Sequence, residues 1–217
     1  MEQTLLNTPT PTTPSSTASG TSPSGYDVRR LQGKLVDVWP YHEPIFPAET
    51  LPKMWEWMQE DRLLHRVFYE HGKAMTFPEM CRYFDSRLSP DRLLLLFTTK
   101  AGDGAGFGWF DQVKQGLRAT ANICMRKKYW GAHTDEASRI ALDYIFGAFG
   151  VLTVFGLTPV ANHLALAQAK RLGFKPIARI PKLVAFNGTP MDVVMTYLPK
   201  ETWNGRYGTS PTPDGRS

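Results

Sequence analysis

The stretch RKKYWGAHTDEASRIALDYIFGA, residues 126–148, decides the fold, because it joins a basic, glycine-containing turn to a helix. Thr134 is the expected N-cap, and Gly147 and Gly150 mark the expected end of the helix. A turn at a helix N-terminus exposes unpaired backbone N–H groups and the positive end of the helix dipole. We therefore expect an anion site in this turn. The apolar face of the helix is formed by Ala137, Ile140, Ala141, Tyr144, Ile145 and Ala148.

Strands are predicted on both sides of this segment. LLLLFTT at 93–99 and FGWF at 107–110 flank a glycine-rich turn and indicate a hairpin. After an expected polar link at 111–116, residues 117–125, LRATANICM, alternate apolar and polar side chains. VLTVFGL at 151–157 indicates a buried strand. Because one helix connects these last two strands, we expect them to be parallel.

The remaining pattern predicts a mixed sheet flanked by helices, which is an α/β (α+β) fold. Thr50, Thr76 and Asn162 are the expected N-caps of its three other helices. The expected elements are a strand at 34–38, helices at 49–62, 77–88 and 163–172, and a final strand pair at 175–186 and 191–198.

A chain of 217 residues with 42% hydrophobic residues can bury one core, so we expect one domain. Residues 1–25 are rich in Thr, Pro and Ser and predict a disordered tail, either dispensable or a tether. The domain is expected at 26–203, and residues 204–217 are expected to form a flexible C-terminal tail.

The composition limits the classes of partner. A net charge of +5 permits an anionic ligand, but 21% charged residues of both signs do not favour nucleic acid. Cys81 and Cys124 alone make neither a disulfide framework nor a zinc site, which favours a reducing cytoplasm and no metal. No apolar run is long enough to cross a membrane, and no signal peptide is indicated.

Three segments resemble the GNAT superfamily (GCN5-related N-acetyltransferases), and most closely its ribosomal-protein alanine N-acetyltransferase-like branch. KKYWG at 127–131 resembles the pyrophosphate loop of that branch, and GTPMDVVMTYL at 188–198 resembles its last strand. TPVANHLALAQAKRLGFKPIARI at 158–180 resembles the segment between them. The resemblance covers residues 93–198, whereas the preceding residues agree in element order only.

The resemblance implies a mostly antiparallel sheet in which two parallel strands, 117–125 and 151–157, splay apart. It also implies acetyl-CoA as co-substrate, with the pyrophosphate at 128–134 and the pantetheine arm beside 122–125. Backbone groups near Ile123, Cys124 and Met125 would contact the arm and stabilise an oxyanion. The implied cofactor-binding residues are Ile123, Met125, Arg126, Lys127, Lys128, Trp130, Gly131, Ala132, His133, Thr134 and Asn162.

Some of these residues have a second interpretation. The basic triplet 126–128 either neutralises phosphates or is simply solvated, and Asn162 is fully explained as a helix cap. His133 stands where the family loop has a small residue; either Ala132 takes that place in a shifted register, or the imidazole points outward or donates to a phosphate. Ala165 replaces the serine proton donor of the branch, so no general acid or base is assigned.

The function implied is direct transfer of an acetyl group from acetyl-CoA to an amine. With no strong base, an α-amine (pKa about 7.7–8.0) or a small-molecule amine is favoured over lysine (about 10.4). The alternative is a catalytically weak GNAT-fold protein that binds a partner or belongs to an assembly. A homodimer, or a partner protein held through the tails, is compatible with the sequence. A nucleotide-binding protein is disfavoured because GKS/GKT is absent.

Overall fold

A computed structural model of the chain describes residues 30–40, 49–68, 75–85, 91–186 and 188–208. The tail expected at 1–25 and the residues from 209 onward lie outside this part. Within it, no helix has the length and apolar character needed to cross a membrane.

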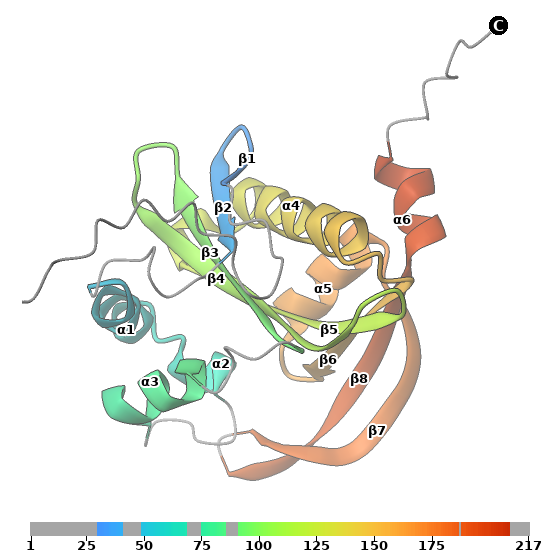
Figure 1. The fold of residues 1–217 in the computed structure, drawn as a ribbon. Helices are drawn as coiled ribbons and strands as arrows, with labels where there is room; N and C mark the ends of the chain where they lie inside the picture. Colours follow the sequence, from blue (N-terminus) through green and yellow to red (C-terminus); the bar gives the residue numbers. More distant parts are fainter. Residues whose placement is uncertain (1–29, 41–48, 69–74, 86–90, 187, 209–217) are drawn as a thin grey trace, which may run out of the picture.

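In the described part of the chain, eight strands form one sheet in the order β1-β2-β3-β4-β5-β6-β8-β7 (Figure 1). All neighbouring strands are antiparallel except β5 and β6, which are parallel as expected. The strands are β1 Leu31–Gln32, β2 Val36–Pro40, β3 Leu93–Thr99, β4 Gly104–Lys114, β5 Arg118–Met125, β6 Thr153–Pro159, β7 Lys175–Phe186 and β8 Thr189–Pro199.

Helices cover both faces of the sheet, with α1, α2 and α3 on one face and α4 and α5 on the other (Figure 1). They are α1 Thr50–Glu60, α2 Leu64–Val67, α3 Phe77–Asp85, the 3₁₀ turn η3 Lys127–Tyr129, α4 Ala132–Ala148, α5 His163–Leu172 and α6 Lys200–Tyr207.

The apolar run of β3 is explained by burial on both faces. Leu95 and Phe97 pack into the core beneath α4, whereas Leu94 and Leu96 pack into the core beneath α1 and α3. Successive side chains of a strand point to opposite faces, so a strand buried on both sides needs apolar residues throughout. The sheet is therefore the middle layer of a three-layer fold.

Two expected helix caps are wrong. Gly131, not Thr134, precedes the first residue of α4, and the Thr134 hydroxyl donates instead to the Tyr129 carbonyl oxygen at 3.0 Å. Thr50 is the first residue of α1, and Glu49 before it makes no side-chain cap bond. The cap at Asn162 is confirmed, because its side chain accepts a bond from the Ala165 N–H.

The boundaries of several elements also differ from those expected. β4 continues to Lys114 through a bulge, although 111–116 was expected to be a link, because its pairing with β5 resumes there. β2 and β6 each begin two residues later than expected, at Val36 and Thr153. The helix expected at 77–88 is described from Phe77 to Asp85, and residues 86–88 lie outside the described part.

The C-terminal boundary at Trp203 is wrong, because α6 continues to Tyr207. The Trp203 indole N–H donates to Asp143 Oδ1 at 2.7 Å, and Lys200 Nζ donates to the Phe146 carbonyl at 2.9 Å. These contacts hold α6, whose sequence is mostly polar, against α4. Half-burial raises the Asp143 pKa, although the Trp203 bond opposes that effect.

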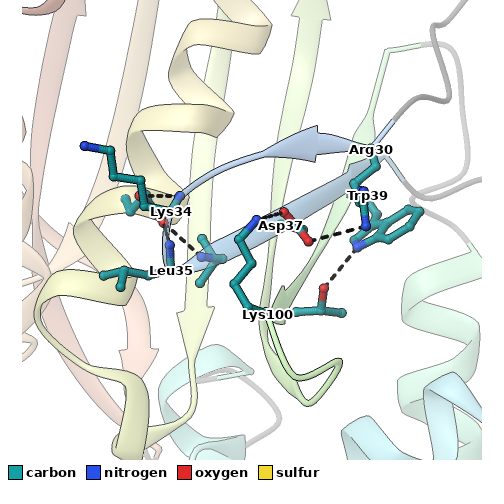
Figure 2. A network of polar contacts seen from close by, with 9 residues as sticks. Arg30, Lys34, Leu35, Asp37, Trp39 and Lys100 are labelled. Atoms are coloured by element: carbon teal, nitrogen blue, oxygen red, sulfur yellow. Dashed lines mark hydrogen bonds and ion pairs between the residues drawn. The ribbon is translucent and has the colours of Figure 1, made fainter.

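Glu136 on α4 holds the turn between β1 and β2, in which Figure 2 labels Lys34 and Leu35. Its carboxylate accepts bonds from the backbone N–H groups of Lys34, Leu35 and Val36 at 2.9, 2.6 and 2.8 Å. Gly33 is required here, since a Cβ would lie 2.7 Å from Glu136 Oε2 and 2.5 Å from the Val36 oxygen. Figure 2 also shows Asp37 of β2 paired with Arg30 and Lys100. The edge of the sheet is thus fixed to α4.

We expect Glu136→Gln to lower stability by about 1–2 kcal/mol near neutral pH, because an amide cannot accept three N–H donors as a carboxylate does. Burial alone would raise the Glu136 pKa, but the three backbone donors outweigh it and hold the pKa below its ordinary value. The contribution is therefore complete above the unfolded pKa of about 4.3 and is lost as pH falls through the folded value. Thermal unfolding of both proteins at pH 7 and pH 3 measures this; a gap that does not narrow at pH 3 contradicts it.

Candidate functional site

β5 and β6 pair over only three residues each, 118–120 with 153–155. Beyond that point β6 stays paired with β8 and β5 stays paired with β4, so the two parallel strands separate. We call the gap between residues 121–125 and 156–159 the wedge. Its existence confirms the expected splay, and it leaves strand backbone without a neighbouring strand among the described residues.

The strand register shows which backbone groups face the wedge. The Arg126 N–H donates to the Ala105 carbonyl on β4 at 2.9 Å, and alternate residues of an antiparallel strand bond to the same neighbour. Cys124 therefore directs its N–H and C=O to β4, whereas Ile123 and Met125 direct theirs into the wedge. The backbone of Cys124 therefore cannot make the ligand contact that was expected of it. Ile123 and Met125 stay in the candidate set.

The Cys124 thiol lies in the core beneath α1 and α3. Burial, reinforced by the negative charge of Asp61, raises its pKa far above the ordinary value of a thiol. A neutral, buried thiol is a poor nucleophile. Cys124 is thus not a candidate for a covalent intermediate.

A cavity of about 500 Å³ passes through the wedge from one face of the sheet to the other. On the side of α4 and α5 it is lined by Ser138, Ala141, Ala165 and Gln168, and on the side of α2 and α3 by Phe68, Tyr83, Trp109, Asp111 and Asn122. Ile123 and Asn162, both expected site residues, also line it. A ligand that occupies the cavity can therefore be reached from both faces of the sheet.

Gly131 shapes the turn at the open end of the wedge. Its φ of 89° and ψ of −123° belong to a region that residues with a side chain avoid, although a Cβ there would meet nothing within 4 Å. Glycine is thus required by backbone conformation and not by space. The turn starts α4 at Ala132, so the N–H groups of Ala132, His133 and Thr134 have no partner within the helix.

The three basic residues before this turn have different surroundings. Arg126 is paired with Glu60 at 3.1 Å and Asp61 at 3.6 Å at the end of α1. Lys127 and Lys128 are exposed, although Lys128 Nζ lies 4.8 Å from the centre of the Tyr129 ring. The two lysines, unlike Arg126, remain available to an anion at the turn.

Trp130 lies across the end of β5. Its indole N–H donates to the Met125 carbonyl oxygen at 2.9 Å, and the Arg66 guanidinium lies 5.8 Å from its ring centre. The Met125 carbonyl is therefore occupied, while its N–H still faces the wedge.

His133 is the second residue of α4, and its ring centre lies 5.3 Å from that of Tyr129. The imidazole packs beside the aromatic ring of its own turn. This contact places no bulky group at the first helical position, which Ala132 occupies.

Side chains that sequence reasoning missed connect α4 to α5. Gln168 Nε2 donates to Ser138 Oγ at 2.8 Å, and Ser138 Oγ donates to the Thr134 carbonyl at 2.8 Å. Both side chains line the cavity. The spacing of Thr134 and Ser138 by one helical turn was the available signal, but nothing in the sequence placed Gln168 beside them. Ala165 lines the same wall and carries no proton donor.

Asp111 is a second feature that the sequence did not single out. Its Oδ2 accepts bonds from Trp109 Nε1 at 2.9 Å and Asn122 Nδ2 at 3.3 Å, and Arg92 Nε lies 3.5 Å from Oδ1. Among the described residues no group of three or more His, Cys, Asp or Glu side chains could hold a metal ion.

Comparison with models of protein families found no match, and comparison with curated protein sequences found none either. Solved structures do match. A GCN5-related N-acetyltransferase from Brucella melitensis aligns with a TM-score of 0.67 and 16% identity over 82% of this chain and 81% of that chain. The chain has the GNAT fold.

Two further structures with this fold were solved in complex with coenzyme A. The spermidine N-acetyltransferase from Vibrio cholerae, with CoA and spermine, aligns with a TM-score of 0.66 and 13% identity, covering 79% of this chain and 99% of that chain. A ribosomal L7/L12 α-N-protein acetyltransferase (RimL) aligns with a TM-score of 0.67 and 11% identity, covering 80% and 99%. The GNAT fold expected from the sequence is confirmed.

Proposed function

We propose that the protein is an acetyl-CoA-dependent N-acetyltransferase that transfers an acetyl group directly to an amine. The observation that carries this proposal is the wedge, where the backbone of Ile123 faces a cavity that crosses the sheet and the N–H of Met125 faces the gap beside it. Unpaired strand backbone must find a hydrogen-bonding partner, and the amide-rich pantetheine arm supplies one. The fold neighbours, described as N-acetyltransferases and in two cases holding CoA, support it.

The pyrophosphate is assigned to the turn at the start of α4. The N–H groups of Ala132, His133 and Thr134 and the helix dipole favour an anion there, and Lys127 and Lys128 add positive charge. From this turn the pantetheine arm enters the wedge beside Met125 and Ile123 and reaches Asn162 at the start of α5. Trp130 covers the entrance to the wedge. The ion pairs of Arg126 direct the Arg126 side chain to α1 instead.

In the reaction the amine nitrogen attacks the thioester carbonyl carbon, the C–N bond forms, and the C–S bond breaks. The wedge-facing N–H of Ile123 is the donor assigned to the developing oxyanion. The proton that the nitrogen loses ends on the thiol of CoA. Ala165 cannot donate it, yet a general acid contributes about 10²- to 10⁴-fold, whereas positioning supplies effective molarities of about 10⁵–10⁸ M. Transfer without that acid is therefore feasible.

We assign the acceptor to the protein N-terminal α-amines, which reach the neutral, attacking form at lower pH than lysine does, or to small-molecule amines. A cytoplasmic location is proposed from the cysteine content, because two cysteines do not make a disulfide framework. A second candidate is a GNAT-fold protein that binds acetyl-CoA or a partner with little catalysis. Ala165, which lacks the proton donor of the branch, favours it.

Acetyl-CoA at 100 times its Kd is expected to stabilise the protein by about 2.7 kcal/mol, which raises Tm by roughly 5–10 °C for a domain of this size. Thermal unfolding with and without the ligand measures this effect. Thiol release is then followed with n-butylamine, spermidine and the peptide Ser-Gly-Gly-Gly as acceptors. No shift at millimolar acetyl-CoA contradicts the proposed function, and a shift without acceptor-dependent thiol release supports the binding-only candidate.

A further inference from the structure

Asp111 is the only carboxylate among the described residues that line the cavity. Its side chain is 19% exposed and lies on the face of the sheet covered by α1–α3, opposite α4 and α5. The pantetheine arm approaches from the α4 side in the proposed function, so the acceptor reaches the thioester from the side of Asp111. The carboxylate therefore stands on the acceptor's path.

The contacts of Asp111 direct it toward the reacting centre. Asp111 itself pairs with Thr120, but its two donors, Trp109 and Asn122, form the next pair on the same face, nearer the open end of the wedge. Both bonds go to the same oxygen, Oδ2, and draw it along the strands. Asn122 directly precedes Ile123, whose N–H faces the thioester position. The carboxylate thus leans toward the place where the amine must react.

The wall around Asp111 combines aromatic rings with positive charge. Tyr83 packs edge-on against Trp109 with ring centres 6.2 Å apart, which provides an apolar surface. Arg66 and Arg118 also line the cavity, and Arg92 contacts Asp111 itself. Nearby cations disfavour an ammonium ion and so increase the share of neutral, attacking amine. They also repel any acceptor that carries several positive charges.

We propose that Asp111 accepts a hydrogen bond from the N–H of the acceptor and so directs the nitrogen lone pair at the thioester carbon. The acceptor class that fits this site is a primary monoamine with an apolar body, rather than a polyamine. Trp109 and Asn122 are positioning residues that act through Asp111. This inference rests on the proposed function and adds a residue and a substrate class to it.

The test is Asp111→Asn, which keeps the shape of the side chain but presents an amide where Trp109 and Asn122 donate. With the most active acceptor of the three-amine panel, we expect kcat/KM to fall about 10- to 100-fold, in line with the loss of a hydrogen bond to a charged group. The acetyl-CoA-induced Tm shift should be unchanged. Asp111→Glu should recover part of the activity. Asn122→Ala, a milder change that leaves the carboxylate in place, should lose about 3- to 10-fold.

Asp192→Asn is the matched control, since Asp192 also pairs with an arginine, Arg179 at 2.8 Å, but is not among the residues that line the cavity. It should leave kcat/KM unchanged. Equal acceptor kinetics for Asp111→Asn and wild type overturn the inference and leave the proposed function standing. Loss of the acetyl-CoA-induced Tm shift in Asp111→Asn also overturns the inference. A preference for spermidine over n-butylamine and the peptide overturns the monoamine class. Wild-type protein without acceptor-dependent thiol release overturns both proposals.

Discussion

Gly131→Val is expected to weaken acetyl-CoA binding by about 100-fold, equivalent to roughly 3 kcal/mol or the loss of two hydrogen bonds to a charged group. Gly131 has a φ of 89° and a ψ of −123°, which a β-branched residue avoids. To accept valine, the chain must rotate φ to a negative value. That rotation redirects the first N–H groups of α4 away from the pyrophosphate position. Titration calorimetry with acetyl-CoA measures the change in Kd.

Gly147→Val is the control for this variant. Gly147 lies in the last turn of the same helix, has no positive φ, and would place a Cβ within 4 Å of nothing. Acetyl-CoA should bind it as tightly as wild type. Wild-type affinity in Gly131→Val would show that the pyrophosphate does not use this turn.

His133→Gly tests whether acetyl-CoA binding uses the backbone of the turn or the His133 imidazole. The imidazole packs beside Tyr129, so its removal should preserve or improve acetyl-CoA binding. Loss of binding in this variant would instead make the imidazole a ligand contact.

Local pattern predicted the elements whose residues are determined by their own neighbours. The alternation in residues 117–125 and the continuous apolar run at 93–99 follow from burial on one or both faces of a strand, and both became strands. Asn162 caps α5 as expected, and Gly173 ends the helix in the left-handed conformation at φ 99°. The connection of β5 to β6 through a single helix fixed their parallel pairing and so the wedge.

Features that depend on residues far apart in sequence could not be predicted. In the sequence, Arg126 was a plausible phosphate ligand. In the structure it is paired with Glu60 and Asp61 at the end of α1. Thr134 is a residue type that often caps helices, but the helix begins earlier, directly after Gly131. Asp111 was assigned to a polar link from its local sequence. Its contact with Asn122 depends on the pairing of β4 with β5, which local sequence does not show. Local preference proposes such roles, and tertiary contacts decide them.

Ala165→Trp is expected to reduce kcat/KM at least about 100-fold, because the indole would fill the cavity where the pantetheine arm meets α5. Ala165 is half-buried and lines the cavity, so the larger ring enters ligand space and leaves the packing of the two cores intact. Binding of acetyl-CoA should be lost together with activity, while Tm without ligand stays close to that of wild type. The Tm shift with acetyl-CoA and thiol release measure the two effects.

Ala167→Trp makes the same substitution two residues further along α5, at an exposed position that does not line the cavity. Any general effect of a tryptophan on this helix should appear equally in both variants. Only Ala165→Trp should lose the acetyl-CoA shift. If both variants bind acetyl-CoA and release thiol as wild type does, the arm does not pass α5, and the assignment of the cavity to the pantetheine is wrong. If Ala165→Trp binds acetyl-CoA but releases no thiol, the indole blocks the acceptor alone, and the arm must enter the wedge nearer to Met125.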